Sequence, residues 1–298
     1  MRLGAFLPPW GDQATPADFD LLAQGVEDLG YDSLWTGDHV VFPKDVVSRY
    51  PYNATGAFPF DPDQPLFEPL TLLAYLAGRT TTVRLGISVL VLPMRNPVIT
   101  AKMLADIDNL TCGRLELGVG VGWLREEFEA LAADFTTRGD LTEEWITILR
   151  QLWTAGSPTR FEGPHYRFAP LALLPRPNRP IPILIGGNSR SALRRAARLG
   201  DGWHGVRLAP EQVRAAVRRL RTDLADANRD PAGFRVVVRT SVNPGHVAYE
   251  LDSYAAAGVD ELIVEVPETS TERRLRVLAT VREAHESRPE VHVELPDP

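Results

Sequence analysis

The sequence predicts an α/β protein that folds as a single (β/α)8 TIM barrel over residues 1–298. Strand-like and helix-like patterns alternate eight times along the chain, and no linker separates two halves. The segment 83–92 is almost wholly apolar and rich in β-branched residues, as a strand covered by helices on both faces requires. A doubly wound open sheet is the alternative, because periodicity alone does not show that a sheet closes.

Short apolar runs bounded by turn residues predict the strands. The predicted strands cover residues 2–7, 33–36, 83–92, 114–123, 181–185, 202–206, 234–242 and 261–266. The pair Pro8-Pro9 stops the first strand, because proline cannot donate to a ladder of hydrogen bonds. Each strand leads into a helical pattern, so neighbouring strands are predicted to run parallel.

Capping residues mark the helices between these strands. The predicted helices cover residues 15–29, 69–79, 96–110, 124–153 with a break near Gly139, 189–199, 210–228, 246–257 and 271–285. Asn96 before Pro97 combines an N-cap side chain with proline at the first helical position, and Gly30 ends the first helix.

Two segments interrupt the regular alternation. Segment 40–68 follows the second strand, is rich in Pro, Tyr and Phe, and is long enough to predict a lid, a binding loop or disorder. Segment 161–179 is an excursion before the fifth strand. Its place between a helix and a strand puts it on the amino-terminal side of the barrel, so we interpret it as structural or as an interface.

Composition and charge exclude several classes of partner. The formal net charge is -7 and no dense basic run occurs, so we expect no nucleic-acid partner and no membrane partner. The chain enters a strand pattern at once, without a signal-peptide pattern, and no apolar run approaches membrane-spanning length. Cys112 is the sole cysteine, which excludes an internal disulfide and suits a reducing compartment. We therefore expect a cytoplasmic protein.

Asp38 and His39 follow the second strand, at the end of the barrel where active sites of this fold form. A histidine can serve as general acid or base near neutral pH, and a neighbouring carboxylate can tune it. The alternative is a histidine hydrogen-bonded within a loop, with Asp38 as a turn cap. The histidines form no HxH or HExxH pattern, so we predict no catalytic metal.

The segment 114–123, RLELGVGVGW, carries glycines at every second position. These are Gly118, Gly120 and Gly122, followed by Trp123. Because strand side chains alternate between faces, three glycines in phase leave one face bare. We interpret this face as a bed for a flat ligand. The alternative is a bulge or close packing at a corner of the barrel.

Three further features could contribute to a site at this end. Residues 186–189, Gly186-Gly187-Asn188-Ser189, lead into a helix whose first N–H groups suit a phosphate, although an ordinary N-cap is the alternative. Four arginines on the same rim would suit a polyanion, or would be solvated charges: Arg95, Arg125, Arg207 and Arg239. Aromatic residues of segment 40–68 could wall an apolar pocket or anchor the loop: Tyr50, Tyr52, Phe58, Phe60 and Phe67, alongside Trp10 and Trp123.

The glycine motif also resembles the nucleotide loop of adenosylmethionine-dependent methyltransferases. Those folds need a second strand soon afterwards, ending in an acidic residue. Here segment 124–153 has a helical pattern, and three strand–helix units precede the motif. The motif agrees with a methyltransferase but its context does not.

Four blocks make the chain resemble the bacterial-luciferase-like flavin and deazaflavin oxidoreductases over essentially its whole length. They are GYDSLWTGDHVVFP at 30–43, VRLGISVLVLPMRNP at 83–97, GRLELGVGVGWLREEFEAL at 113–131 and IGGNSRSALRRAARLGDGW at 185–203. Within this superfamily the chain is similar to the branch described as coenzyme F420-dependent. The resemblance implies a (β/α)8 barrel that is commonly a homodimer.

The resemblance also implies roles for residues at the site. His39, in the pair Asp38-His39, would lie against the reactive part of an isoalloxazine or deazaflavin ring. Ser88-Val89 matches a bulge with a non-prolyl cis peptide that supports the back of the ring. The glycine strand with Trp123 would form the floor beside the ring, and residues 186–189 would supply amides for the phosphate.

The choice of cofactor sets the reaction. A deazaflavin passes hydrides, whereas FMN in this family typically serves monooxygenases that are fed by a separate reductase. The rim arginines favour F420, which carries an oligoglutamate tail. We expect hydride transfer between F420 and a small substrate with a C=O, C=C or C=N bond, with His39 as proton donor or acceptor. An FMN-dependent monooxygenase, or a protein that binds the cofactor without turnover, are the alternatives.

Overall fold

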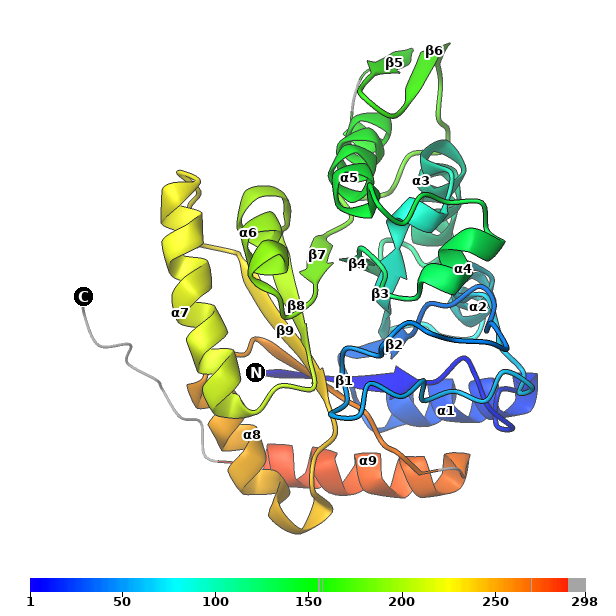
Figure 1. Cartoon of the computed structure of the whole chain (residues 1–298). Coiled ribbons are helices and arrows are strands. Elements are labelled where there is room, and N and C mark those ends of the chain that lie inside the picture. The colour runs from blue at the N-terminus through cyan, green and yellow to red at the C-terminus, as the bar shows by residue number, and fades with distance from the viewer. Residues whose placement is uncertain (155, 157, 269, 289–298) are drawn as a thin grey trace.

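The computed structural model describes residues 1–298 except 155, 157, 269 and 289–298, and it contains a closed parallel barrel (Figure 1). The barrel strands are β1 (Arg2–Leu7), β2 (Ser33–Thr36), β3 (Arg84–Val91), β4 (Leu115–Gly120), β7 (Ile183–Gly186), β8 (Gly202–Val206), β9 (Arg235–Thr240) and β10 (Glu261–Val264). Their order around the barrel is β1-β10-β9-β8-β7-β4-β3-β2. The predicted TIM barrel is confirmed, and the open sheet is excluded.

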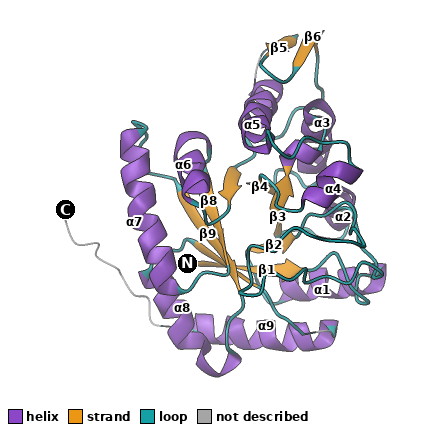
Figure 2. Ribbon diagram, in the orientation of Figure 1, coloured by secondary structure: helices purple, strands orange, loops and turns teal. Residues whose placement is uncertain are grey.

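Helices surround the barrel (Figure 2). They are α1 (Pro16–Asp28), α2 (Pro69–Ala77), α3 (Pro97–Leu110), α4 (Arg125–Ala130), α5 (Arg138–Thr154), α6 (Arg190–Leu199), α7 (Pro210–Asp226), α8 (Val247–Ala256) and α9 (Thr271–Glu286). The Asn96 side chain accepts from the N–H groups of Val98 and Ile99 and caps α3, as predicted. Within the described residues, no helix is both long and apolar enough to cross a membrane.

The predicted break in helix 124–153 is confirmed, although it lies before Gly139 and is longer than expected. The chain leaves the helical path after α4 and resumes it at Arg138. Ala132 adopts the left-handed conformation with a φ of 52°, which stops α4. The Asp134 carboxylate then accepts hydrogen bonds from Thr136 and Thr137 in the turn between the two helices.

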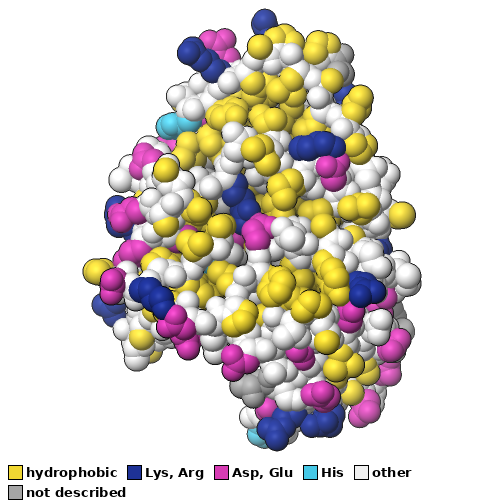
Figure 3. All heavy atoms as spheres, turned by 90° about the vertical axis from the view of Figure 1, so that its right-hand side faces the viewer, with side chains coloured by type: hydrophobic (Ala, Val, Ile, Leu, Met, Phe, Trp, Pro, Cys, Tyr) yellow, Lys and Arg dark blue, Asp and Glu magenta, His cyan; other side chains and the backbone are white. Residues whose placement is uncertain are grey.

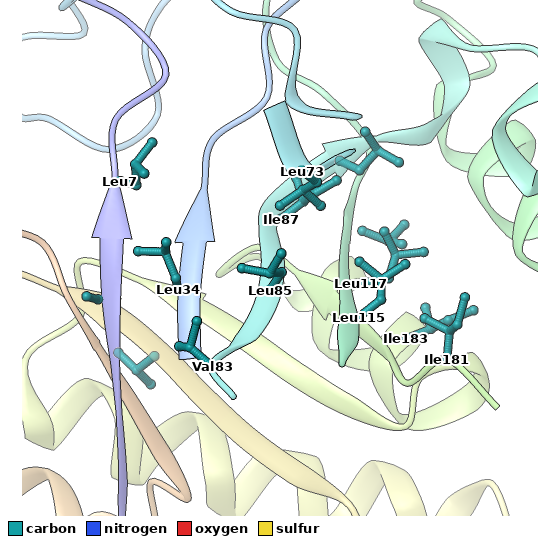
Figure 4. Close-up of a cluster of buried hydrophobic side chains, with 14 of the residues drawn as sticks. Leu7, Leu34, Leu73, Val83, Leu85, Ile87, Leu115, Leu117, Ile181 and Ile183 are labelled. Atoms are coloured by element: carbon teal, nitrogen blue, oxygen red, sulfur yellow. The ribbon is translucent and has the colours of Figure 1, made fainter. Parts of the chain in front are cut away.

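The hydrophobic core lies between the barrel and the helices. Side chains on the outer face of the strands, such as Leu34, Leu85 and Leu117, are fully buried there and point toward the helices (Figure 4). Because alternate residues of each strand point outward and inward, the other set fills the barrel interior. The outer set therefore stabilises the scaffold, and the inner set shapes the two ends of the barrel.

The amino-terminal end of the barrel interior is filled by an ionic layer. Arg235 donates to Glu116 (2.9 Å) and to Glu261 (2.7 Å), and Arg84 pairs with the same two carboxylates. Above this layer, Trp35 occupies the middle of the barrel, where its indole N–H donates to the Ser33 hydroxyl (2.7 Å). These side chains fill the lower barrel, so the carboxyl ends of the strands are left to hold a ligand.

The excursion before β7 folds as an antiparallel hairpin, β5 (Thr159–Glu162) and β6 (Arg167–Leu171), at one end of the molecule (Figure 1). Its return segment does reach the amino-terminal side, where the Asn178 N–H donates to Asp108 near the end of α3 (2.7 Å). The tip of the hairpin does not: the Tyr166 hydroxyl accepts from Asn96 at the start of α3 (2.9 Å). The excursion as a whole thus contacts both ends of α3, which corrects the predicted one-sided placement.

The hairpin region also presents an apolar outer surface. Leu174, which follows β6, is 65% exposed, and Ile99 and Leu110 on α3 are 60% and 62% exposed. Figure 3 shows hydrophobic side chains gathered over this upper part of the molecule.

Candidate functional site

A cavity of about 440 Å³ opens at the carboxyl ends of the barrel strands. The predicted site residues that line it are Asp38, His39, Ser88, Val89, Gly120, Gly122, Trp123, Gly186, Gly187, Asn188 and Ser189. Gly118 is not among the lining residues. The cavity therefore collects residues from β2, β3, β4 and β7 that lie up to about 150 positions apart in the chain, because parallel strands end at the same rim.

His39 forms one wall of the cavity and is held by a carboxylate. Its Nδ1 lies 2.8 Å from Oε2 of Glu127, which is 1% exposed at the start of α4. The other oxygen of Glu127 accepts from the N–H of Val40 (2.6 Å). An ionised carboxylate only accepts, so Nδ1 of His39 is the donor in this pair. The ring nitrogen Nε2, on the opposite edge, is left for chemistry in the cavity.

Glu127 is the functional residue that the sequence reasoning missed. We expected Asp38 to tune His39, but both oxygens of Asp38 are engaged elsewhere: one accepts from Arg95 (2.7 Å) and the other from the N–H of Val91 (2.6 Å). Burial raises the pKa of Asp38, and these two donors oppose the rise. Asp38 thus ties β2 to the end of β3. The acidic residues that open the helix after the glycine strand were the available signal for Glu127.

Val89 forms the floor of the cavity. The Ser88–Val89 peptide is cis, and the pairing of β3 with β4 shifts register between Ile87 and Leu90, as the family resemblance implies. Val89 packs so tightly on Gly120 that a Cβ at that glycine would lie 2.6 Å from its Cγ2. Within the described residues the buried Ser88 hydroxyl has no hydrogen-bond partner.

The three in-phase glycines serve three different purposes. A Cβ on Gly118 would lie 2.3 Å from the Ile87 carbonyl oxygen, so this glycine allows β3 and β4 to approach closely. Gly120 makes room for Val89, which covers the face that we expected to be bare. Gly122 has a φ of 81° and turns the chain out of the strand. The close-packing alternative therefore accounts for Gly118, and the Val89 side chain, instead of bare backbone, faces the cavity.

Residues 186–189 lead into α6, and the N-cap uses only one of the N–H groups in the first turn of that helix. The Ser189 hydroxyl accepts from the Ala192 N–H (3.2 Å), so the N-cap alternative is confirmed. Asn188 does not point its amide at the cavity centre: its oxygen and nitrogen bond the N–H (3.1 Å) and carbonyl (2.8 Å) of Val206. The first-turn N–H groups of Arg190 and Ser191 have no acceptor within a helix, so they can receive an anion.

The rim arginines are not free for a polyanion. Arg95 is bound to the carboxylates of Asp38 and Glu68. Arg207 and Arg239 both pair with Glu265, and Arg125 stacks on an aromatic ring. Of these four arginines, Arg239 lines the cavity, where its Nη1 donates to the Ser88 carbonyl (2.9 Å). Three of the four arginines therefore already have carboxylate partners, which weakens the expectation from charge of a polyanionic tail.

Aromatic rings form a wall of the cavity. Phe60 lies at the centre of this group: its ring centre is 4.7 Å from that of Trp10 and 5.4 Å from that of His39. Tyr50 packs against Trp123 (5.1 Å), and both line the cavity. Phe67 instead anchors segment 40–68 by packing edge-on against Phe19 of α1, whereas Phe58 packs within the segment on Phe42. Both alternatives left open by the sequence are thus realised, by different residues.

Metal ligation has no support in the described part of the chain. There, no group of three or more His, Cys, Asp and Glu is placed to hold a metal ion. His204 is buried in β8, and burial together with Arg239 lowers its pKa to about 3. Its ring therefore stays neutral at physiological pH and packs edge-on against Trp35, with ring centres 5.6 Å apart.

Comparisons with known proteins agree with this geometry. The sequence profile described as luciferase-like monooxygenase matches residues 1–293. An uncharacterized protein of Mycobacterium tuberculosis is 38% identical over 205 residues, which are 68% of this chain and 70% of that protein. Another protein of M. tuberculosis, provisionally named a coenzyme F420-dependent oxidoreductase, is 32% identical over 233 residues, which cover 72% of this chain and 57% of that protein.

The fold is also similar to that of solved enzymes. An F420-dependent secondary alcohol dehydrogenase, in complex with an F420–acetone adduct, superposes with a TM-score of 0.79 at 17% identity. The superposition covers 95% of this chain and 98% of that one. At this identity the likeness establishes the fold only.

Proposed function

The chain belongs to the luciferase-like monooxygenase family, whose members are oxidoreductases and monooxygenases, and from that premise we propose that it is an F420-dependent oxidoreductase. It transfers a hydride between bound F420 and a small substrate with a C=O, C=C or C=N bond. The observation that carries the proposal is the His39–Glu127 pair (2.8 Å) at the wall of a cavity whose floor is apolar.

The cavity residues match what a flat tricyclic cofactor needs. Val89 offers an apolar surface to one face of a ring, and the Ser88 hydroxyl, without a partner among the described residues, offers a hydrogen bond to a polar edge. The first turn of α6 offers N–H groups to a phosphate. Reduced F420, when bound, supplies a hydride and does not usefully activate oxygen. The provisional name of the 32%-identical relative, and no longer the rim arginines, favours F420.

His39 is proposed as the group that supplies or takes the proton. Glu127 fixes the orientation of the ring and keeps a proton on Nδ1, so Nε2 exchanges the proton that accompanies the hydride. A carbonyl that receives a hydride on carbon needs a proton on oxygen, and the reverse reaction releases one. Because His39 is 7% exposed, this proton moves within a wall of side chains and not in bulk water.

Fluorescence titration of the purified protein with F420, and in parallel with FMN, tests the choice of cofactor. We expect tight binding of F420 and weak binding of FMN. Hydride transfer is then followed by the loss of F420 absorbance as the cofactor is reduced by an alcohol, or by its return as a ketone or enone is reduced. Tight binding of FMN alone would overturn the proposal.

An FMN-dependent monooxygenase is the second candidate, favoured by the description of the matching family. It would use reduced flavin delivered by a separate reductase. Oxygen consumption that depends on supplied reduced FMN identifies this activity. A protein that bound either cofactor but gave no turnover with any substrate would match the third alternative.

We also propose that the protein is a homodimer, as the family resemblance implies. The exposed Ile99, Leu110 and Leu174 of the hairpin region offer an apolar surface for a second copy. Light scattering during size exclusion gives the mass directly, and a mass of 33.0 kDa would exclude the dimer.

A further inference from the structure

The aromatic wall of the cavity converges on one side chain. Phe60 stacks on Phe42 with ring centres 4.9 Å apart, and packs edge-on against Trp10 at 4.7 Å and His39 at 5.4 Å. Tyr50 lies 6.2 Å from it on the other side. Aromatic rings in such edge-on arrangements present a rigid, flat-sided apolar wall. A substrate within reach of His39 must therefore contact Phe60.

Charged groups at the cavity wall are paired within the protein. The charged residues that line the cavity, besides His39, are Asp38, Glu127, Arg195 and Arg239. Each has a partner: Asp38 pairs with Arg95, Glu127 with His39, Arg195 with Glu143 (3.2 Å), and Arg239 with Glu265 (3.4 Å), which it shares with Arg207. A charged substrate would lose its hydration shell and would have to compete with these partners for a counter-charge.

We propose that the substrate is an uncharged, ring-bearing ketone or enone, and that Phe60 determines this specificity. The inference rests on the proposed function, because it concerns the substrate half of the same cavity. Val89 and the strand ends line another part of the cavity, which leaves the aromatic wall to the substrate. A six-membered or aryl ring packs on the cavity side of the cluster formed by Phe60, Trp10 and Tyr50, and its carbonyl faces Nε2 of His39.

Calorimetry on the full chain loaded with oxidised F420 tests this class of substrate, because a ketone cannot be reduced in that state. Acetophenone and 4-oxopentanoate share a methyl ketone but differ in ring and charge. We expect acetophenone to bind at least tenfold more tightly than 4-oxopentanoate. The variant Phe60→Leu should weaken acetophenone fivefold or more and leave 4-oxopentanoate unchanged. Equal binding of the two ketones, or no effect of Phe60→Leu, would overturn the inference.

Phe168→Leu is the matched control. Phe168 stacks on Phe161 in the hairpin and lies outside the cavity, so this change should leave both affinities unaltered. Thermal unfolding of both variants verifies that they fold, and Phe60→Tyr, which keeps the ring, should retain acetophenone binding.

Turnover separates the two proposals. Binding of acetophenone without its reduction by reduced F420 would contradict the hydride-transfer function and support the substrate class. Reduction of 4-oxopentanoate, with neither binding nor reduction of acetophenone, would contradict the substrate class and support the function. If F420 itself fails to bind, the same calorimetry on the protein without cofactor still tests whether Phe60 selects the ring.

Discussion

The floor and the aromatic wall of the cavity are built in different ways. Val89 in the floor is fixed by the β3, β4 and β7 backbone of the closed barrel, and the glycines beneath it leave it almost no freedom to move. Apart from Trp10, His39 and Trp123, the wall comes from segment 40–68. This segment pairs with the rest of the chain as a strand only through Leu66 and Trp10 among the described residues. Its other ties are side chains, above all the adjacent carboxylates Glu126 and Glu127.

Because of this difference, substitutions in the floor and in the wall should affect different properties of the protein. Changes in the floor alter contacts between backbone segments, so they should act first on the free energy of unfolding. Changes in the wall alter side chains over a formed barrel, so they should act on turnover and on substrate binding. Loops carried on a rigid scaffold are where function can change at little cost to the fold.

The largest effect is expected for Gly118→Ala in the floor. The new Cβ would lie 2.3 Å from the Ile87 carbonyl oxygen, which is backbone and cannot rotate away. We expect a loss of about 2–3 kcal/mol or more in the free energy of unfolding, measured by denaturant titration. Gly78→Ala is the control: its Cβ would lie 3.6 Å from the nearest atom, and its stability should match the wild type. Equal stability of Gly118→Ala would mean that the floor is not rigid.

His39→Ala, in the wall, should instead act mainly on turnover, because it removes the proton donor. Its effect on stability should be smaller than that of Gly118→Ala, because the buried Glu127 keeps the N–H donors of Val40 and Val41. A positioned acid–base group contributes about 10²–10⁴-fold to a rate, so turnover should fall by at least about 10². Binding of F420, followed by fluorescence, should persist. Turnover at the wild-type rate would show that His39 is not the proton donor.

Glu127→Gln should give a smaller loss. The amide can still accept from the Val40 N–H through its oxygen, but it then presents an N–H₂ group to Nδ1 of His39. This reverses the tautomer of the ring, so we expect turnover to fall by about tenfold while the fold is retained. Steady-state kinetics on Glu127→Gln and His39→Ala, and on the double variant, measures the coupling. Fully additive losses would show that the pair does not act as a unit.

The smallest effect is expected for Glu126→Gln, and it depends on pH. Burial alone would raise the pKa of Glu126, but hydrogen bonds from the Ser48 hydroxyl and from the N–H groups of Val47 and Ser48 outweigh it and lower the pKa to about 2. Because the pKa of Glu126 is lower in the folded protein than its ordinary value, its hydrogen bonds to segment 40–68 contribute fully to stability above about pH 4.5. This contribution is lost as the pH falls toward 2. Limited proteolysis of segment 40–68 at pH 7 should be a few-fold faster in the variant, and the difference should shrink near pH 3. A constant difference across this range would exclude Glu126 as the titrating tie.

Some features of the site could be predicted because they are local in the chain. The Asn96 cap of α3 and the Ser189 cap of α6 follow from two or three adjacent residues. The placement of His39 at the carboxyl end of β2 follows from the rule that residues after parallel strands meet at one rim. Neither inference requires knowledge of which distant side chains are neighbours.

By itself the sequence determined the strand–helix alternation and the rim on which His39 lies, because periodicity and capping are properties of short segments. Only the tertiary structure decided that the sheet closes and which side chains are partners. In the folded chain His39 pairs with Glu127, 88 positions away, the adjacent Asp38 pairs with Arg95, and Val89 covers the glycine face of β4. The physical reason is that a buried charge takes whichever partner the closed barrel brings within hydrogen-bond distance, and closure is a property of the whole chain.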